Sequence, residues 1–231
     1  MTRQKDLDRF YALLGDWVAQ PGHLRRLGDP RAGRGLPTQG VYFLFEPGEL
    51  RADGTTLRVT RVGTHAVSAG SHSTLWQRLR AHRGTLRGSS AGGGNHRGSV
   101  FRRHVGEALL ARDGHGALET WGKGSTASRL VRQGEHNWEV TVSSYLADFL
   151  FTWVPLPGPA SADNDRARLE RNAIALLSNL RRPGFNPPSP RWLGRSSSTA
   201  EIQASGLWNV EHVAAQPQGG WLDVLEASLA R

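Results

Sequence analysis

The amino-acid sequence predicts an α+β fold: a small three-stranded antiparallel sheet flanked by helices, with an extra N-terminal helix and a C-terminal extension. Three runs rich in β-branched and aromatic residues indicate the strands. Longer segments with apolar residues every three or four positions indicate the helices. The 231 residues contain no internal repeat, and 38% are hydrophobic, which suffices for one core. We therefore expect an N-terminal packing helix and linker (1–38), a main domain (39–187) and a C-terminal extension packed on it (188–231).

Residues 3–19 form the first predicted helix. Pro21-Gly22 follows as a stop signal. The apolar side chains that recur at helical spacing are Leu7, Phe10, Tyr11, Leu14, Trp17 and Val18. A single apolar stripe of this kind favours a helix packed on the domain over a dimerisation helix. Residues 23–39 are rich in Arg, Gly and Pro, so we expect a linker or an ordered loop there.

Two strands are predicted next, over residues 40–46 and 57–64. Both are rich in β-branched or aromatic residues, as is typical of strands. Pro47-Gly48 and Asp53-Gly54 between them are turn signals. The two strands are therefore expected to form an antiparallel hairpin.

A helix is predicted over residues 75–82. Ser73 or Thr74 can cap its start, and Gly84 can end it. At about 100° per residue, the side chains of Leu75, Arg78, Leu79 and His82 fall within one arc. A cation and an imidazole therefore flank an apolar seam that should pack on the hairpin.

The rest of the chain alternates polar loops with three further helices and a strand. A glycine-rich loop spans 84–98, and Ser99 is expected to cap the next helix. Residues 112–135 are polar and carry no clear pattern, and 138–147 are helical or irregular. The short apolar run 149–154 predicts a third, central strand. A long helix should start near Asp163 or Asn164 and run to about Leu180, and a short terminal helix should cover Trp221 to Leu229.

The charge of the chain is strongly positive. The net charge is +9 and the sequence pI is near 11.1. Almost all basic residues are arginines, since Lys5 and Lys123 are the only lysines. The guanidinium fork binds phosphate oxygens in bidentate fashion, so the composition favours a polyanionic partner, above all nucleic acid. The alternative is that the charge is only solvated surface.

Composition also bears on location. The chain has no cysteine, which excludes disulfides and thiolate metal sites. The N-terminal residues lack an apolar core of the kind found in secretory signals, and no apolar run approaches membrane-spanning length. We therefore expect a cytoplasmic protein without a membrane partner.

Three short motifs appear in order across the hairpin and the helix after it: Gly40-Val41-Tyr42, Arg61-Val62-Gly63 and the Arg-Leu-x-x-His run of residues 78–82. In sequence, spacing and context the chain resembles the GIY-YIG nuclease superfamily, over roughly residues 39–187. One departure is Arg61, which stands where that family usually has a tyrosine. The family's remaining signature is a glutamate on the helix after the third strand, and Glu170 fills that position.

The resemblance implies a metal-dependent endonuclease that hydrolyses phosphodiester bonds in DNA. Tyr42 is then the general base, and Arg78 holds the non-bridging phosphate oxygens. His82 relays a proton or binds the phosphate. Glu170 is a hard oxygen ligand for Mg²⁺ or Mn²⁺. Arg61 should face the site, where it either stabilises the phosphate or marks a protein that binds DNA without cutting it.

Further residues are expected to contact DNA phosphates or positions next to them. Two lie in the glycine-rich loop and two at the start of the following helix, where backbone N–H groups favour anions. Another follows the Glu170 helix at a position where the family often has asparagine. With a cation on the helix of residues 75–82, the set is Arg80, His96, Arg97, Arg102, Arg103 and Asn186.

Two alternatives stay open beside the nuclease. One is a catalytically inactive nucleic-acid-binding module on the same fold, and the other is an interaction protein whose charge is incidental. A zinc site is disfavoured, because the five histidines between residues 65 and 104 match no zinc-ligand spacing and no thiolate is present.

Overall fold

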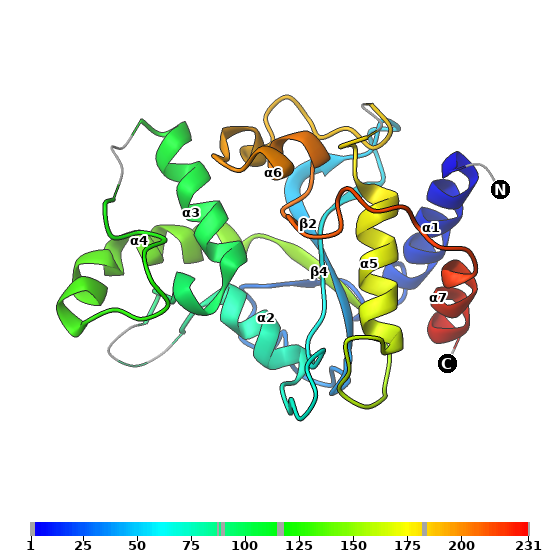
Figure 1. The fold of residues 1–231 in the computed structure, drawn as a ribbon, viewed down its shortest axis with the longest axis horizontal. Coiled ribbons are helices and arrows are strands. Elements are labelled where there is room, and N and C mark those ends of the chain that lie inside the picture. Colours follow the sequence, from blue (N-terminus) through cyan, green and yellow to red (C-terminus); the bar gives the residue numbers. More distant parts are fainter. Residues whose placement is uncertain (1–2, 87, 89–90, 115–117, 182–183, 231) are drawn as a thin grey trace.

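The computed structural model of the chain is an α+β fold built on one antiparallel sheet (Figure 1). It describes residues 3–86, 88, 91–114, 118–181 and 184–230. The strands are β1 (Arg25–Arg26), β2 (Gly40–Leu50), β3 (Leu57–Gly63) and β4 (Leu150–Pro155), in the order β1-β4-β2-β3. The predicted fold class is confirmed. A two-residue strand, β1, joins the sheet from a segment for which the sequence predicted only a linker or loop.

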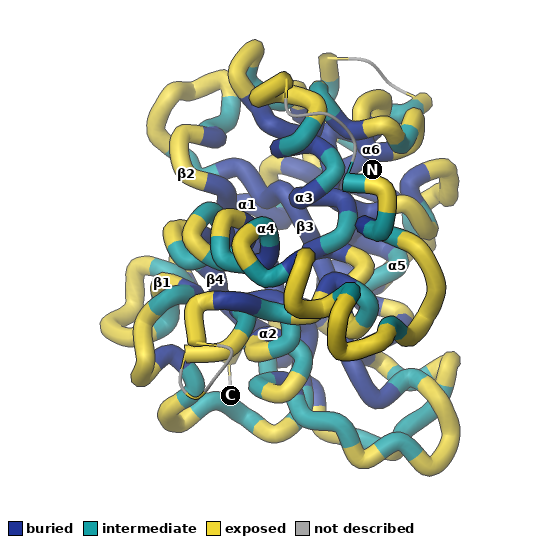
Figure 2. Tube along the Cα trace, turned by 90° about the vertical axis from the view of Figure 1, so that its left-hand side faces the viewer, coloured by how far each residue is buried: buried dark blue, intermediate teal, exposed yellow. Residues whose placement is uncertain are grey.

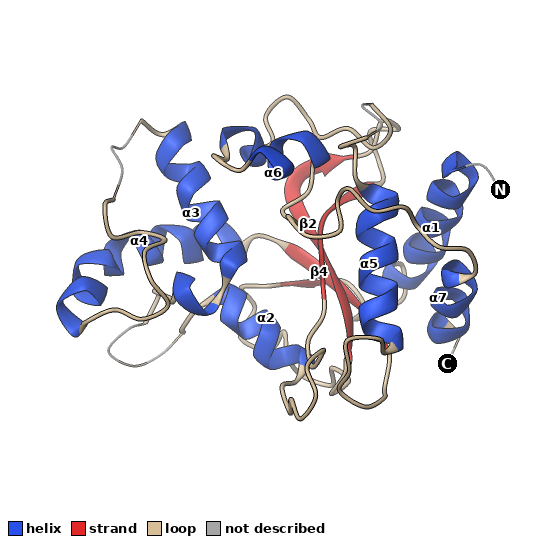
Figure 3. Cartoon of the chain, viewed as in Figure 1, coloured by secondary structure: helices blue, strands red, loops and turns tan. Residues whose placement is uncertain are grey.

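Seven α-helices surround this sheet in the described part of the chain (Figure 3). Two 3₁₀ turns accompany them, η1 (His96–Gly98) and η2 (Leu193–Ser196). The helices are α1 (Arg3–Val18), α2 (Leu75–Arg83), α3 (Val100–Arg112), α4 (Arg129–Ala147), α5 (Asp165–Leu177), α6 (Ala200–Ser205) and α7 (Trp221–Leu229).

Helix boundaries follow the predicted caps, with one clear difference. The side chains of Thr74, Ser99 and Asn164 each accept a hydrogen bond from the first turn of α2, α3 and α5. Helix α4 begins at Arg129, well before the helical or irregular segment expected from residue 138. The Oγ of Ser128 caps it by accepting from the backbone N–H of Val131, so a polar stretch that lacks an apolar pattern is nevertheless helical.

The hairpin differs from the prediction in where its turn lies. Strand β2 continues through Pro47-Gly48, and the connection to β3 is made further on, where Asp53 accepts hydrogen bonds from two backbone N–H groups. Register shifts interrupt the pairing after Leu44 and after Phe45. Pro47 lies between shifted registers, and such bulges tolerate proline because the ladder is already broken there.

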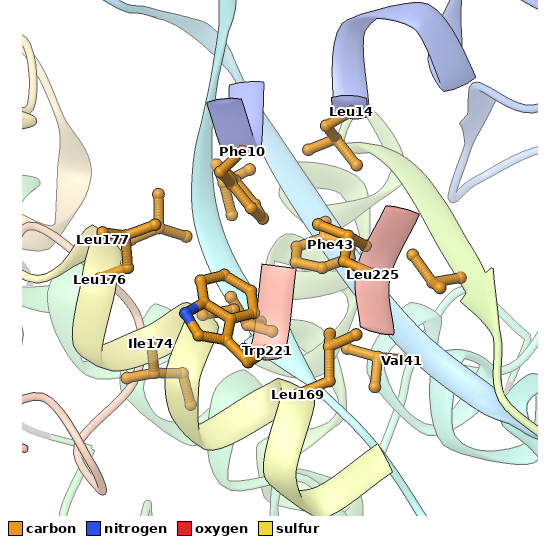
Figure 4. Packing of buried hydrophobic residues seen from close by; sticks show 14 of the residues in the cluster. Phe10, Leu14, Val41, Phe43, Leu169, Ile174, Leu176, Leu177, Trp221 and Leu225 are labelled. Atoms are coloured by element: carbon orange, nitrogen blue, oxygen red, sulfur yellow. The ribbon is translucent and has the colours of Figure 1, made fainter. Parts of the chain in front are cut away.

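Residues of the sheet alternate between two buried layers. Val41, Phe43 and Phe45 of β2 point into the first layer, which α1, α5 and α7 cover (Figure 4). Tyr42 and Leu44 point into the second, which is covered by α2, α3 and α4. Figure 2 shows most of β3 and β4 as dark, buried tube, whereas β1 and the far end of β2 are more exposed. The side-chain period of two thus places Tyr42 on the face that also receives the predicted site helix.

The first and the last helix of the chain, α1 and α7, pack together on the first layer. Helices α1 and α7 pack side by side at one end of the molecule, and α4 lies at the other end (Figure 1). An Arg9 guanidinium nitrogen lies 2.7 Å from a carboxylate oxygen of Asp223 and also contacts Glu226. Trp221 and Leu225 complete the apolar contact, so the terminal helix is part of the core and not an appendage.

The C-terminal extension covers the outer edge of β3. The backbone N–H of Trp208 donates to the carbonyl of Thr60 (2.8 Å). The Asn209 side chain accepts from the N–H of Val62 (3.1 Å) and donates to its carbonyl (2.9 Å). Arg58 donates to the carbonyl of Gly206 (2.7 Å). An edge strand with unpaired backbone groups would be a site for aggregation, and here the same chain pairs it.

Two buried glutamates of β2 bind the same extension. Glu46 accepts hydrogen bonds from the indole N–H of Trp208 (2.7 Å) and of Trp192 (2.9 Å), and from the Tyr145 hydroxyl. Burial raises the pKa of Glu46 above its usual range, and these donors oppose that rise. Glu49 lies 2.7 Å from Nη2 of Arg58 in a buried ion pair. The extension is therefore held to the sheet by polar contacts as well as by apolar packing.

Replacing Asn209 with alanine should destabilise the fold, because it leaves the N–H and C=O of Val62 buried without partners. Each such group costs roughly 1–3 kcal/mol, so we expect a loss of about 2 kcal/mol in the free energy of unfolding. Urea denaturation would measure it, with Val210→Ala as the neighbouring, more exposed control. Equal stability of the two variants would show that the Asn209 side chain does not hold the edge.

Candidate active site

The centre of the site is a hydrogen-bonded row of three side chains from three elements. The Tyr42 hydroxyl on β2 lies 2.7 Å from Nε2 of His82 on α2. The other ring nitrogen of His82, Nδ1, lies 2.8 Å from Oγ of Ser99, which caps α3. Tyr42 and His82 are both 0% exposed. The row thus connects the sheet, the site helix and the next helix.

Local structure fixes the position of the phenol. Tyr42 pairs with Gly63 across the hairpin, and its hydroxyl lies over that residue. A Cβ atom at position 63 would be 2.1 Å from the hydroxyl oxygen, a distance that van der Waals contact forbids. The position of the Tyr42 phenol therefore requires glycine at position 63. This is a physical reason why the two motifs occur together.

His82 is electrically neutral in this environment. Its pKa is well below the usual value, first because the ring is buried, and then because of the charges of Arg61, Arg78 and Arg102. A neutral imidazole has one N–H donor and one acceptor nitrogen. The ring can therefore accept a proton from Tyr42 at Nε2 only transiently, because a lasting positive charge is unfavourable here.

Two arginines supply positive charge around this row. Nη1 of Arg61 donates to the carbonyl of Trp208 (2.7 Å), and its guanidinium carbon lies 5.0 Å from the centre of the Phe101 ring. Arg78 projects from α2. Nε of both arginines is buried and has no hydrogen-bond partner within the described part of the chain. Such groups are suited to receive an anionic oxygen.

Glu170 on α5 completes the site. Its Oε1 accepts a hydrogen bond from the backbone N–H of Thr64 (3.1 Å), just after β3. Burial raises its pKa to about 7, and the nearby charges of Arg61 and Arg78 oppose the rise. The same two arginines act on His82 and on Glu170, so the five residues predicted to be catalytic are Tyr42, Arg61, Arg78, His82 and Glu170, and they lie around one centre.

The residues present fit a magnesium-type ion better than zinc. Among the residues that the structure describes, no group of three or more His, Asp or Glu side chains could hold a metal ion. Mg²⁺ and Mn²⁺ need fewer protein ligands, because they keep several waters and bind substrate oxygens. Oε1 of Glu170 is occupied by Thr64, and no described residue donates a hydrogen bond to Oε2. This second oxygen is the hard ligand available to such an ion.

A small open cavity of about 380 Å³ adjoins the site beside Arg78. Its walls come from α2 and from the segment after β3, including Thr64 and His65. His65 has a structural role there, with Nδ1 2.8 Å from the Ser73 carbonyl and Nε2 accepting from the N–H of Gly40 (3.3 Å). The cavity offers a route from solvent toward the guanidinium group of Arg78.

His96 does not have the DNA contact that the sequence suggested. Its ring is 1% exposed and stacks on Trp121, with 3.9 Å between ring centres. Nδ1 lies 3.0 Å from a carboxylate oxygen of Glu139, and Nε2 accepts from the N–H of Gly122 (3.1 Å). Both ring nitrogens are occupied, so the expectation is corrected: His96 anchors the loop to α4.

The expected DNA contacts of Arg97 and Arg102 are also corrected, because both guanidinium groups pair with glutamates. Arg97 donates two hydrogen bonds to the carboxylate of Glu135 (2.6 and 2.8 Å), and its side chain is 4% exposed. Arg102 is fully buried, paired with Glu139, and donates to the carbonyl of His82 (2.9 Å). These arginines connect α4 to η1 and α3, and their guanidinium groups are bound to glutamates.

The other three residues that were predicted to contact DNA, Asn186, Arg103 and Arg80, differ in exposure. Asn186 is buried and hydrogen-bonded to Asn179 and Tyr11, so a direct phosphate contact is excluded in this structure. Arg103 is partly exposed and lies 3.7 Å from Glu107. Arg80 is exposed on α2, at the rim of a larger groove, and its contact with DNA stays a prediction.

Sequence reasoning missed the residues that position the site. Ser99 was recognised only as a cap, although the same oxygen contacts His82. The carbonyl of Trp208 and the amide of Thr64 are backbone groups, which no side-chain pattern can reveal.

The strand–strand–helix unit with Tyr42 and His82, and the later helix with Glu170, define an α+β domain with a buried, arginine-rich candidate site. The chain belongs to the GIY-YIG family: a family model described as GIY-YIG domain matches residues 1–231. This is a nuclease family whose enzymes are hydrolases and generally depend on a divalent metal ion. No match was found among curated proteins or among solved structures. In the described ranges, no helix has both the length and the apolar character needed to cross a bilayer.

The raised pKa of Glu170 predicts a pH dependence of stability. Its folded-state pKa is about 7 and its ordinary value 4.5, so the protonated form is favoured by folding. The stabilisation is complete below about pH 4.5 and is lost as the pH rises through about 7. Relative to Glu170→Gln, which stays neutral, the wild type should lose about 2 kcal/mol across this range when allowance is made for partial exposure. Urea unfolding in EDTA measures the difference, and parallel curves for the two proteins would contradict it.

Proposed function

We propose that the protein is a divalent-metal-dependent endonuclease that hydrolyses phosphodiester bonds in DNA. The observation that carries this proposal is the hydrogen bond between the Tyr42 hydroxyl and His82, placed among two arginines and next to Glu170. A weak acid coupled to a neutral imidazole is suited to removing a proton from water. Cations beside it are suited to binding the phosphate whose negative charge increases during attack.

The reaction needs a proton acceptor for the water and stabilisation of the phosphate. Tyr42 takes the proton of the attacking water as its own phenolic proton moves to Nε2 of His82. The resulting imidazolium, whose Nδ1–H is hydrogen-bonded to Ser99, is transient and loses its extra proton to solvent as the leaving 3′ oxygen takes one up. Arg78 and Arg61 bind non-bridging oxygens through N–H groups that have no partner now. The water oxygen forms the new bond to phosphorus, and the 3′ oxygen leaves. A divalent ion on Glu170 would supply Lewis-acid stabilisation of the leaving oxygen.

The site must open slightly for this chemistry. Tyr42 and His82 are both 0% exposed, so substrate binding has to move a neighbouring side chain before water reaches the hydroxyl. Arg61 is a candidate on the predicted phosphate side, because in the described part of the chain its guanidinium group has one hydrogen bond, to Trp208, and a contact with the Phe101 ring. Catalytic contacts in ligand-free sites often become complete only when the substrate is bound.

The burial of Tyr42 and His82 also favours a second candidate function. A phenol with no exposed surface, together with an arginine at the position of the family's second tyrosine, suits a catalytically inactive module that binds nucleic acid. Nicking of a supercoiled plasmid in Mg²⁺ but not in EDTA distinguishes the two. Salt-sensitive DNA binding without any nicking would support the inactive module.

Glu170→Ala should abolish metal-dependent cleavage while leaving DNA binding intact, because it removes the carboxylate that we propose as the ligand of the ion. Asp163→Ala and Asp165→Ala are matched controls, since both carboxylates lie near the start of α5 and are exposed. Plasmid nicking with Mg²⁺ and Mn²⁺ measures cleavage, and fluorescence anisotropy of labelled DNA measures binding. Full activity in the Glu170 variant, with loss in a control, would assign the metal to a different carboxylate.

Tyr42 and His82 should act as one catalytic unit. Tyr42→Phe and His82→Gln each remove one side of the hydrogen bond, so each should slow single-turnover cleavage by a factor of about 10² or more. The double variant should be hardly slower than either single variant. Thermal unfolding of all three proteins checks that the fold is kept. Independent, multiplying effects would show that the residues do not share a proton.

A further inference from the structure

A second, larger groove lies between α2 and α4, away from Glu170. Its volume is about 760 Å³, and it is open to solvent. The floor and walls come from α2, from residues 84–86 and 94–98 after it, and from the N-terminal part of α4. Its polar lining includes Gln77, Arg80, Arg83, Asn95, Arg132 and His136. We refer to it as the α2–α4 groove.

Arg83 is the unusual residue in this groove. Its side chain is packed against Trp76, with the guanidinium carbon 4.8 Å from the ring centre, and the residue is only 8% exposed. Nε and Nη1 are buried, yet no acceptor contacts them among the residues that the structure describes. Burial and the charge of Arg80 lower the pKa of Arg83. Buried N–H groups of a cation that lack acceptors are unfavourable, so an anion in the groove that accepted from them would reduce this cost.

The groove is positively charged although two glutamates line it. Glu135 is neutralised by Arg97, and Glu139 by Arg102. Arg80, Arg83 and Arg132 remain, and none of the three forms an ion pair with an acidic residue in the described ranges. Three uncompensated guanidinium groups along one groove indicate an extended anion rather than a single small one.

The groove is continuous with the approach to the catalytic centre. Gln77 and Ala81 on α2 line both the α2–α4 groove and the smaller cavity beside Arg78. A chain of phosphates that passes Arg78 at the centre would therefore cross α2 and enter the groove. Arg80 and Arg83 are three residues apart on that helix and present neighbouring contacts.

We propose that the α2–α4 groove binds the backbone phosphates of the DNA flank on one side of the cut, with Arg80, Arg83 and Arg132 as the contacts. This inference rests on the proposed function for the identity of the substrate. The proposal assigns phosphate binding to arginines that have no acidic partner in the described ranges. Arg97 and Arg102 are not assigned this role, because they form ion pairs with Glu135 and Glu139. The contacts are to phosphates, so they hold the duplex in position without reading its sequence.

The test is DNA binding in EDTA, in the Glu170→Gln background, so that cleavage plays no part. Arg80→Gln, Arg83→Met and Arg132→Gln are titrated with a labelled duplex between about 50 and 200 mM salt. Each variant should lower the slope of log K against log salt by about 0.9, the value for one lost phosphate contact. Lys5→Ala is the control, because this exposed cation lies on α1, on the other side of the sheet, and should change the slope little.

Arg83→Met separates a binding role from a structural one. Methionine keeps an apolar stem against Trp76 but removes the unpaired charge, so the unfolding temperature should stay equal or rise while DNA binding weakens. A fall in unfolding temperature with unchanged DNA affinity would show that Arg83 serves the fold. Inorganic phosphate is titrated at constant ionic strength in the same proteins. Saturable phosphate binding that Arg83→Met removes, without an effect on DNA, would identify a small-anion site and overturn the proposal.

The two proposals fail in different ways. Unchanged salt slopes in all three variants of a protein that cuts DNA would overturn the groove assignment alone. Reduced slopes in a protein whose wild type never nicks a plasmid would overturn the nuclease and leave the groove as the DNA-binding surface. If Lys5→Ala lowered the slope of log K against log salt as much as the groove variants do, the slope would depend only on the net charge of the protein. That result would also contradict the assignment.

Discussion

The structure depends on the contact between Tyr42 and Gly63 across the hairpin. Only a residue without a Cβ atom lets the phenol lie over the neighbouring strand, where its hydroxyl reaches His82. That hydrogen bond fixes how α2 sits on the sheet, and Ser99 extends the same row to the first turn of α3. Packing of the second layer therefore also brings Tyr42 and His82 into hydrogen-bond contact.

The C-terminal extension is part of this site. Its residue Trp208 pairs with β3 through the backbone N–H, accepts the Arg61 guanidinium at its carbonyl and donates its indole N–H to Glu46. An arginine at the second motif position needs such an acceptor, because a buried guanidinium without hydrogen bonds is costly. The substitution of arginine for the family's tyrosine and the presence of a folded extension are thus linked physically.

Local sequence patterns were sufficient to predict part of the fold and the positions of some candidate-site residues. The hairpin, α2 with its cap at Thr74, and the position of Glu170 on α5 follow from periodicity and from the motif order. Arg102 was misjudged because its partner Glu139 lies on a helix far along the chain, and charge alone does not tell a buried ion pair from an exposed contact. The edge pairing by Trp208 uses backbone groups, so only the tertiary structure reveals it.

The packing of the first helix against the last has a practical consequence for protein engineering. Helices α1 and α7 lie together at one end of the long axis, and α4 lies at the other end (Figure 1). A tag or a sequence-reading module joined to either of these helices would therefore attach at the end of the molecule that is remote from α4 and from the wall that α4 gives to the basic groove.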